Sequence, residues 1–134
     1  PNNIKAETIT YYTNDIIEEA SVFNYEHQQF EKVYQKENIH HLDGYDVFLS
    51  GASSLLFIEN KMATTNRELI VFRDSFASSL IPLLIPEYKK ITVIDLRYIG
   101  SNYLKNVSEI NWQENADILL LYSIPVINSS YALK

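Results

Sequence analysis

Ser75 follows an apolar run, at a position where its hydroxyl could act as a nucleophile. The run 69–72 is followed by Arg73, Asp74 and Ser75, and a second apolar run with helical spacing comes next. A serine between a strand and a helix projects its hydroxyl from a tight turn, where nearby backbone N–H groups can stabilise an oxyanion. The structural alternative is a helix cap, because Asp and Ser are preferred N-cap residues. On this interpretation Asp74 holds the turn instead of acting as an acid.

Polar side chains also follow two later apolar runs. Asp95 and Arg97 come at the end of one run, and Tyr122 and Ser123 come at the end of the other. In an open parallel sheet, ligands bind at the carboxyl ends of the strands, so we expect both groups to lie near Ser75. Asp95 and Arg97 are two residues apart and share a face of a regular strand. They predict either an ion pair that closes the strand or, through Arg97, a site for a carboxylate or sugar acid.

Alternating strand and helix patterns from residue 69 onward predict a parallel sheet. Nearly continuous apolar runs indicate strands that are covered on both faces. The expected strands lie at 69–73, 91–96 and 118–122, and the expected helices lie between them at 76–88 and 100–110. Pro82 should kink the first of these helices. Short connections between these elements favour two right-handed crossovers and three neighbouring parallel strands.

The first half of the chain has a less regular pattern. Strands are predicted at 7–12, 20–28, 45–51 and 55–60, and a loop is predicted at 62–68. Phe30, Val33 and Tyr34 recur at helical spacing, which predicts an amphipathic helix over 29–38. The whole chain, 1–134, is therefore expected to be a single α/β domain. We expect a mixed, mainly parallel sheet of about five to seven strands with helices on both faces.

Composition and charge exclude several classes of protein. The chain has 134 residues, of which 46% are apolar and 21% are charged, as is usual for a soluble globular domain. Its net charge of −6 argues against non-specific binding to nucleic acid or to anionic membranes. The absence of cysteine excludes thiol catalysis, thiolate metal sites and disulfides. No apolar run approaches the roughly 20 residues that span a bilayer, so we expect no membrane insertion of this chain.

The 3 histidines are the candidates for a base or a metal ligand. His40, His41 and Asp43 lie close in sequence, but they lack the helical spacing of zinc motifs and an identifiable distant carboxylate partner. We therefore expect no metal ion and no other cofactor. His41 could in principle serve Ser75 as a base, because distance in sequence does not fix distance in space. His27 is expected to be an exposed strand residue.

Three stretches of the chain together resemble a known family. They are YDVFLSG at 45–51, ELIVFRDSFASSLIPLLIPEYKKITVIDLRY at 68–98 and ILLLYSIP at 118–125. Their order and spacing resemble the DHHW family of bacterial proteins, which is similar to SGNH-type hydrolases and to the alginate O-acetyltransferase group. The resemblance implies a three-layer α/β/α, flavodoxin-like fold with a mainly parallel sheet. It also implies that Ser75 stands at the place of the nucleophile and that the protein is extracytoplasmic.

Two departures from that family bear on activity. The Asp-His-His-Trp segment that names the family lies upstream of these motifs and is expected to supply the Asp and His of a catalytic triad. No Asp-His pair occurs in this sequence. The family often shows Gly-Gly-Asn after Phe-Leu, whereas Ser50, Gly51 and Ala52 stand here. If that asparagine helps to hold an oxyanion, Ala52 cannot replace it, because a methyl group donates no hydrogen bond.

The resemblance leads to one principal hypothesis about function. It implies that the chain is the C-terminal part of a longer secreted protein, an O-acyl esterase or acyltransferase acting on cell-surface glycans. Ser75 would be the catalytic residue, and the chain alone would be inactive because the segment with the base is missing. The residues expected to contact the substrate are Asp74, Phe76, Asp95 and Arg97.

Two other functions fit the same sequence. One is a non-catalytic binding or structural module of the cell envelope. The other is an anion-binding domain that uses the helix start at Phe76. The acyl group, the glycan, the choice between hydrolysis and transfer, and the oligomeric state stay open at this point.

Overall fold

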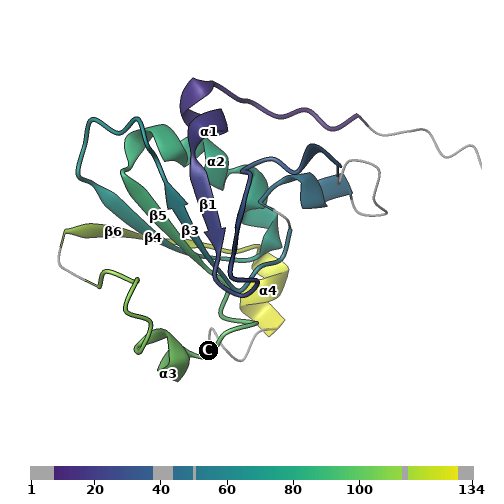
Figure 1. Cartoon of the computed structure of the whole chain (residues 1–134). Helices are drawn as coiled ribbons and strands as arrows, with labels where there is room; N and C mark the ends of the chain where they lie inside the picture. The colour runs from purple at the N-terminus through teal and green to yellow at the C-terminus, as the bar shows by residue number, and fades with distance from the viewer. Residues whose placement is uncertain (1–7, 38–43, 50, 113–114, 130–134) are drawn as a thin grey trace, which may run out of the picture.

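The structure, a computed structural model, describes residues 8–37, 44–49, 51–112 and 115–129 (Figure 1). A six-stranded sheet has the strand order β2-β1-β3-β5-β4-β6. The strands are β1 (Ser21–Asn24), β2 (Gln29–Glu31), β3 (Leu55–Glu59), β4 (Glu68–Arg73), β5 (Lys90–Ile94) and β6 (Ala116–Leu121). The α-helices are α1 (Asp15–Glu19), α2 (Ile81–Leu84), α3 (Ser101–Leu104) and α4 (Ile124–Ser129), and the 3-10 helices are η2 (Gly44–Val47), η3 (Ser75–Ser79) and η4 (Ile85–Glu87). Within these ranges, every helix is too short to cross a membrane.

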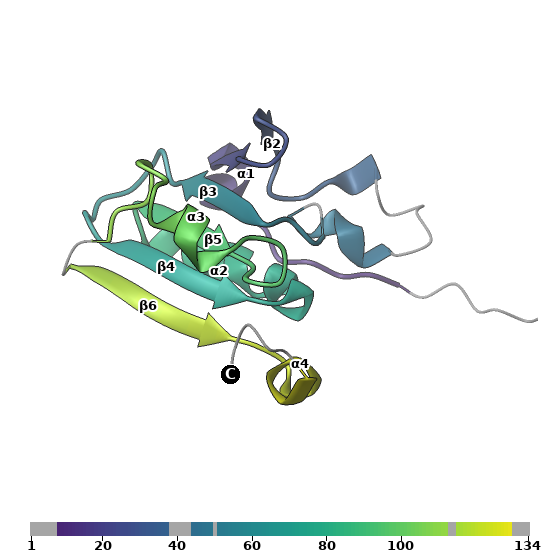
Figure 2. The same ribbon diagram turned by 90° about the horizontal axis from the view of Figure 1, so that it is seen from below.

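The three strands predicted in the second half of the chain are parallel neighbours in one sheet, as expected. β4 lies in the middle and pairs with β5 on one side and with β6 on the other. Val71 of β4 is opposite Val93 in β5 and opposite Leu119 in β6. Figure 2 shows β4 and β6 running side by side in the same direction. The residues that follow these strands therefore emerge at one edge of the sheet.

The other half of the sheet is antiparallel. β3 pairs with β5, and β1 pairs with both β3 and β2, in antiparallel fashion. The α/β class is confirmed, with the parallel pairing confined to β5, β4 and β6. The helix predicted over 29–38 is wrong, because Gln28 adopts a left-handed conformation (φ 53°) and β2 turns back onto β1. Phe30 then lies across from Phe23, with ring centroids 5.1 Å apart.

Three further elements differ from the prediction. The described part of 7–12 forms no strand. Instead of the strand predicted at 45–51 there is η2, followed by an isolated bridge between Tyr34 and Phe48. The helix predicted over 76–88 is divided into η3, α2 and η4. Pro82 does not kink a helix; it stands in the first turn of α2, where its missing N–H costs no hydrogen bond.

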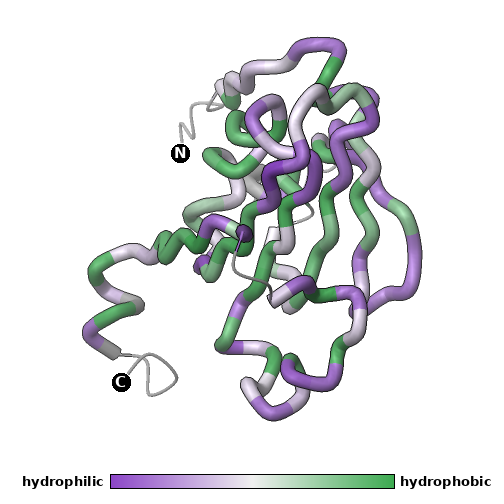
Figure 3. The backbone as a smooth tube through the Cα atoms, turned by 90° about the vertical axis from the view of Figure 1, so that its left-hand side faces the viewer, coloured by the Kyte–Doolittle hydropathy of each residue, from purple (hydrophilic) through white to green (hydrophobic). Residues whose placement is uncertain are grey.

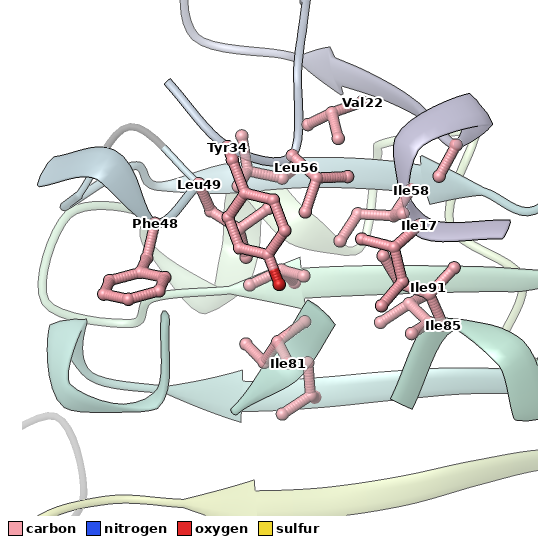
Figure 4. Packing of buried hydrophobic residues seen from close by; sticks show 14 of the residues in the cluster. Ile17, Val22, Tyr34, Phe48, Leu49, Leu56, Ile58, Ile81, Ile85 and Ile91 are labelled. Carbon is pink, nitrogen blue, oxygen red and sulfur yellow. The ribbon is translucent and has the colours of Figure 1, made fainter. Parts of the chain in front are cut away.

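Helices cover both faces of the sheet, as predicted. On one face, Val71 belongs to a cluster with Ile17 of α1 and Ile81 of α2 (Figure 4). On the opposite face, Ile70 belongs to a cluster with Leu104 of α3. Successive residues of a strand point to opposite faces, which explains why neighbours in sequence serve different clusters. Figure 3 shows the resulting concentration of hydrophobic residues along the strands.

β6 is not the fully buried strand that its apolar run predicts. It lies at the edge of the sheet and pairs with β4 alone among the described strands. Leu119 and Leu121 pack against the core on one face. On the other face, Ile118 is 64% exposed and Leu120 is 69% exposed. On that second face the described chain covers Ala116 and leaves Ile118 and Leu120 largely exposed.

Candidate functional site

The turn after β4 is held by the Asp74 carboxylate. Asp74 is the N-cap of η3, and one of its oxygens accepts the Phe76 N–H at 3.0 Å. The other oxygen accepts the Ser123 N–H at 2.6 Å, which joins this turn to the residues after β6. Asp74 is buried. Its geometry is therefore that of a residue that positions its neighbours, as the capping interpretation predicts.

Ser75 is the first residue of η3 and comes directly after Asp74 at the carboxyl edge of the sheet. The residue is partly exposed. Within the described residues, neither its hydroxyl nor its backbone N–H has a hydrogen-bond partner. A hydroxyl that has no such partner, on a partly exposed residue, could receive a substrate. It has no base in the described part of the chain.

Fewer backbone N–H groups are available to bind an anion at the start of η3 than the sequence suggests. Because the Phe76 N–H donates to Asp74, it cannot also donate fully to an external anion or to an oxyanion. This geometry speaks against the anion-binding hypothesis and leaves the Ser75 N–H as the open donor of the turn. Phe76, the residue after Ser75, is 75% exposed.

Asp95 and Arg97 form the ion pair that their spacing predicts. The Arg97 Nε donates to Oδ1 of Asp95 at 3.0 Å, and its Nη2 donates to Oδ2 at 2.7 Å. Asp95 is completely buried, and the Arg97 backbone N–H also donates to it at 3.1 Å. The hydrogen bond to Asp95 raises the pKa of Arg97. With both carboxylate oxygens engaged, this pair closes the end of β5 and has little freedom to act as an acid or base.

Arg73 belongs to the polar group that follows the first apolar run, but the sequence pattern assigned it no role at this edge. Its side chain is completely buried, and burial lowers the pKa of its guanidinium, while the nearby Asp95 and Asp74 charges oppose that shift. It donates to the Gly51 carbonyl at 3.2 Å, to the Ser53 carbonyl at 3.3 Å and to Ser78 Oγ at 3.0 Å. The sequence feature that could have indicated this role is a positively charged residue directly after a run of buried apolar residues.

Through Arg73, the loop 51–53 is fixed next to the Ser75 turn. Gly51 has φ +71°, and a Cβ added there would lie 2.2 Å from Oδ1 of Asp46. Ala52, between the two carbonyls that Arg73 binds, is exposed. The position at which the resemblance expects an asparagine therefore belongs to the same edge of the sheet as Ser75.

Tyr122 adds a hydroxyl to the charged side chains of Arg73, Asp74, Asp95 and Arg97 at this edge. The oxygen is buried and has no hydrogen-bond partner among the described residues. Burial raises the pKa of Tyr122 to about 12, and the Asp95 and Asp74 charges act in the same direction. Tyr122 also lines a hollow of about 230 Å³. The other residues of that hollow are Asp74, Phe76, Ala77, Leu80, Leu121 and Ser123.

The histidine predictions can be tested only in part. His27 is exposed, and its Nδ1 lies 3.5 Å from Oε1 of Glu31, beside the β1–β2 hairpin. His40, His41 and Asp43 lie outside the described residues, so their predicted lack of a metal and the role of His41 as a base stay predictions. Among the residues that the structure describes, no group of three or more His, Asp or Glu side chains is placed to hold a metal ion.

Comparisons with solved structures identify the fold. A scan of the sequence against protein-family models finds no match, and a search among curated proteins finds none either. The structure of Bacillus cereus PatB1 with a sulfonyl adduct matches with a TM-score of 0.65 and 21% identity, over 92% of this chain and 44% of that chain. A second structure of PatB1 matches with a TM-score of 0.63 and 20% identity, over 92% of this chain and 42% of that chain.

A DHHW family protein is also among the matches. The protein, from Eubacterium siraeum DSM 15702, matches with a TM-score of 0.55 and 20% identity, over 77% of this chain and 34% of that chain. The resemblance stated from the sequence is confirmed at the level of the fold. The chain spans less than half the length of each of these three matched chains.

Proposed function

We propose that this chain carries the nucleophile part of an SGNH-like acyl-transfer site, with Ser75 as the nucleophile. The observation that carries the proposal is the Ser75 hydroxyl, which has no hydrogen-bond partner among the described residues. It lies at the carboxyl edge of the parallel strands, on a turn that the buried Asp74 holds in place. The fold of PatB1 supports it, since one PatB1 structure contains a sulfonyl adduct. Sulfonyl reagents form such adducts with nucleophilic side chains.

The proposed reaction proceeds in two steps. Oγ of Ser75 bonds to the carbonyl carbon of an O-acyl ester while its proton passes to a base, and the Ser75 N–H donates to the oxyanion. The bond to the leaving alcohol then breaks, and the base returns the proton to that alcohol. In the second step the oxygen of water or of a glycan hydroxyl attacks the acyl-Ser75 ester and its proton passes to the base. The bond between the acyl carbon and Oγ then breaks, and the base returns the proton to Oγ.

The base is proposed to come from a segment outside these 134 residues. Within the described chain no histidine contacts Ser75, and the sequence contains no Asp-His pair. A triad acts as a unit, so a serine without its base loses nearly all of its reactivity. We propose an extracytoplasmic protein that acts on O-acyl groups of cell-surface glycans, which is what the family resemblance implies.

A non-catalytic module of the cell envelope is the second candidate. Ala52 favours it, because this exposed residue has no side-chain donor at the place where the resemblance expects an asparagine. Loss of one oxyanion donor costs about 3 kcal/mol of transition-state stabilisation. Such a protein could retain the fold and the Ser75 turn without turning over an ester.

Labelling with a fluorophosphonate separates these functions. The 134-residue chain should be labelled no faster than its Ser75→Ala variant, and the complete gene product should be labelled at Ser75. Rapid, Ser75-dependent labelling of the 134-residue chain would contradict a missing base, and His40→Ala and His41→Ala variants would then show whether either residue supplies it. Absence of labelling in both proteins would favour the non-catalytic module.

A further inference from the structure

A hollow of about 430 Å³ lies at the same edge of the sheet as Ser75, beside the antiparallel strands. β1 and β5 each pair with β3 in antiparallel fashion, so β1 runs in the same direction as β5 and β4. The residues after β1 and after β5 therefore emerge at the edge where Ser75 follows β4. Tyr25 and Glu26 line the hollow from β1, and Tyr98 and Tyr103 line it from the segment after β5. We call it the tyrosine hollow, after these three tyrosines.

The tyrosine hollow presents aromatic rings to solvent. Tyr98 is 59% exposed and Tyr103 is 56% exposed. Tyr25 is partly buried and packs against Phe57, with ring centroids 6.0 Å apart. A hydrogen bond with the Tyr103 side chain raises the pKa of Tyr25, so these two side chains meet at their hydroxyls. Because a tyrosine has an apolar body and a polar tip, the hollow offers ring faces for C–H groups and hydroxyls for hydrogen bonds.

Two further acceptors lie on the β1–β2 turn beside the rings. Oε2 of Glu26 accepts the Ser54 N–H at 3.3 Å and the Ser54 hydroxyl at 3.0 Å, so the side chain is held at one end. Its Oε1 has no hydrogen-bond partner among the described residues. Nε2 of Gln28 donates to the Tyr25 carbonyl at 2.6 Å, which leaves the Gln28 amide oxygen as the second acceptor.

A buried polar residue fixes this turn to the rest of the edge. Asn24 is completely buried; its Oδ1 accepts the His27 N–H at 3.0 Å, and its Nδ2 donates to Ser53 Oγ at 3.4 Å. The Ser53 carbonyl accepts from Arg73 at 3.3 Å, so hydrogen bonds connect the β1–β2 turn to the end of β4. A surface held in this way loses little conformational freedom when it binds a ligand.

The charges and rings together select the class of ligand. The Glu26 carboxylate disfavours an anion, and the exposed acceptors disfavour a wholly apolar molecule. A cation could stack on the rings, but the guanidinium of Arg97 already lies over the Tyr98 ring, 5.2 Å from its centroid. An uncharged molecule with several hydroxyl groups and an apolar C–H face uses all of these groups. A pyranose ring of a glycan has this chemistry.

We propose that the tyrosine hollow binds an uncharged pyranose unit of a glycan, stacked on Tyr98 or Tyr103, with its hydroxyls donating to Glu26 and Gln28. This inference rests on the proposed function, because the sugar would belong to the same glycan on which Ser75 acts. Three strand spacings of about 4.8 Å separate β1 from β4, or roughly 14 Å. The sugar in the hollow is therefore a different unit from the one that carries the acyl group.

Calorimetric titration of the complete gene product tests this binding. The protein is used as its Ser75→Ala variant, so that the result does not depend on the nucleophile, and the probes are cellotetraose and tetra-N-acetylchitotetraose. We expect at least one tetrasaccharide to bind, and Tyr98→Ala and Tyr103→Ala each to weaken that binding by at least about tenfold. Tyr12→Ala, at a 63% exposed position outside the hollow, is the matched control and should leave the affinity unchanged.

A second variant separates a sugar from a cation. Glu26→Gln removes the charge and, because Ser54 holds the side-chain oxygen, replaces the open acceptor with an amide donor. A sugar hydroxyl can accept as well as donate, so the tetrasaccharide should lose less than about tenfold in affinity. Tetramethylammonium is the probe for a cation and should not bind. Binding of tetramethylammonium that Glu26→Gln abolishes would assign the hollow to a cation and overturn the proposal.

Two other results would overturn the proposal. One is that neither tetrasaccharide binds, and the other is binding that Tyr98→Ala and Tyr103→Ala leave unchanged. Both side chains are exposed, so an unchanged urea midpoint should confirm that the variants fold. If a fluorophosphonate labels Ser75 but neither tetrasaccharide binds, the proposed function stands and this inference fails. If the hollow binds a tetrasaccharide but Ser75 is never labelled, the glycan site stands and the proposed function fails.

Discussion

The Asp74 carboxylate accepts the backbone N–H of Ser123 at 2.6 Å, across a sequence separation of 49 residues. Its other oxygen accepts the Phe76 N–H, so one buried side chain joins the start of η3 to the end of β6. Asp74→Ala should lower the free energy of unfolding by about 1–3 kcal/mol, because two donors lose their acceptor. Asp74→Asn keeps one acceptor oxygen and should cost less. Urea unfolding measures both, and an unchanged midpoint in Asp74→Ala would mean that the bridge contributes nothing.

The buried guanidinium of Arg73 should contribute more to stability than an exposed one. Arg73→Met removes donors to two carbonyls and to Ser78 Oγ, and we expect a loss of about 3 kcal/mol. Arg67→Met is the control. The Arg67 pair with Asp117 is largely exposed, so its loss should cost far less than the loss of Arg73. Equal losses in the two variants, measured by urea unfolding, would contradict this difference.

Gly51 should not tolerate a side chain. Its φ of +71° disfavours L residues, and a Cβ would lie 2.2 Å from the Asp46 carboxylate. Gly51→Ala should therefore destabilise the protein by about 1–3 kcal/mol. Gly100→Ala is the matched control, because a Cβ there has no heavy atom within 4 Å and φ is negative (−76°). Thermal unfolding of the two variants should separate clearly, and a similar melting temperature would count against the strain at Gly51.

Stability should fall at alkaline pH because two tyrosines are held in the neutral form. Burial raises the pKa of Tyr34 and of Tyr122 from 10.0 to about 12 in each case. The folded state binds these protons more tightly than the unfolded state, so the stabilisation is complete below pH 10.0 and is lost as pH rises toward about 12. Phenolate absorbance should show late-titrating tyrosines, with Tyr34 and Tyr122 among them, and Tyr122→Phe should remove one of them. Titration of Tyr122 at its ordinary pKa would contradict its burial.

Ala52 is the position at which a gain of reactivity is expected. Arg73 binds the carbonyls on both sides of Ala52, so an asparagine there would present its amide at the edge that carries Ser75. In the complete gene product, Ala52→Asn should accelerate fluorophosphonate labelling of Ser75 by up to about 10²-fold, the effect of one oxyanion donor. Ala52→Leu, which also enlarges the side chain but adds no donor, should give no gain. Equal labelling rates in the two variants would mean that the asparagine amide does not cause the gain.

The sequence predicts the parallel strands well and the first half of the sheet poorly, for reasons that particular residues illustrate. Runs such as 69–72 are apolar because both faces of β4 are buried, and that signal is local. The helical spacing of Phe30, Val33 and Tyr34 is misleading, because pairing of β1 with β3 and β2 decides the structure there. Such pairing joins strands that are distant in sequence, so a local pattern of apolar residues does not reveal it.

The candidate site, too, was predicted from the sequence only in part. The carboxyl-edge positions of Ser75, Asp95 and Arg97 follow from the strand pattern, and the ion pair follows from their spacing. The role of Arg73 could not be predicted, because two of its acceptors lie in the loop before β3, about 20 residues away in sequence. The exposure of β6 could not be predicted either, because an edge strand and a central strand can carry the same apolar run.

The position of β4 between β5 and β6 sets the order in which the protein can acquire its site during synthesis. β4 leaves the ribosome before both of its partners, and its pairing with β6 must wait until residue 121 has emerged. At a synthesis rate of about 5–20 residues per second, the interval between β4 and β6 lasts several seconds. Throughout that interval the Ser123 N–H is not available to Asp74, so the serine turn has only its local cap. The Ser75 turn is thus completed only after β6 has been made, and a truncated product that ends before β6 would carry Ser75 without the strand that anchors its turn.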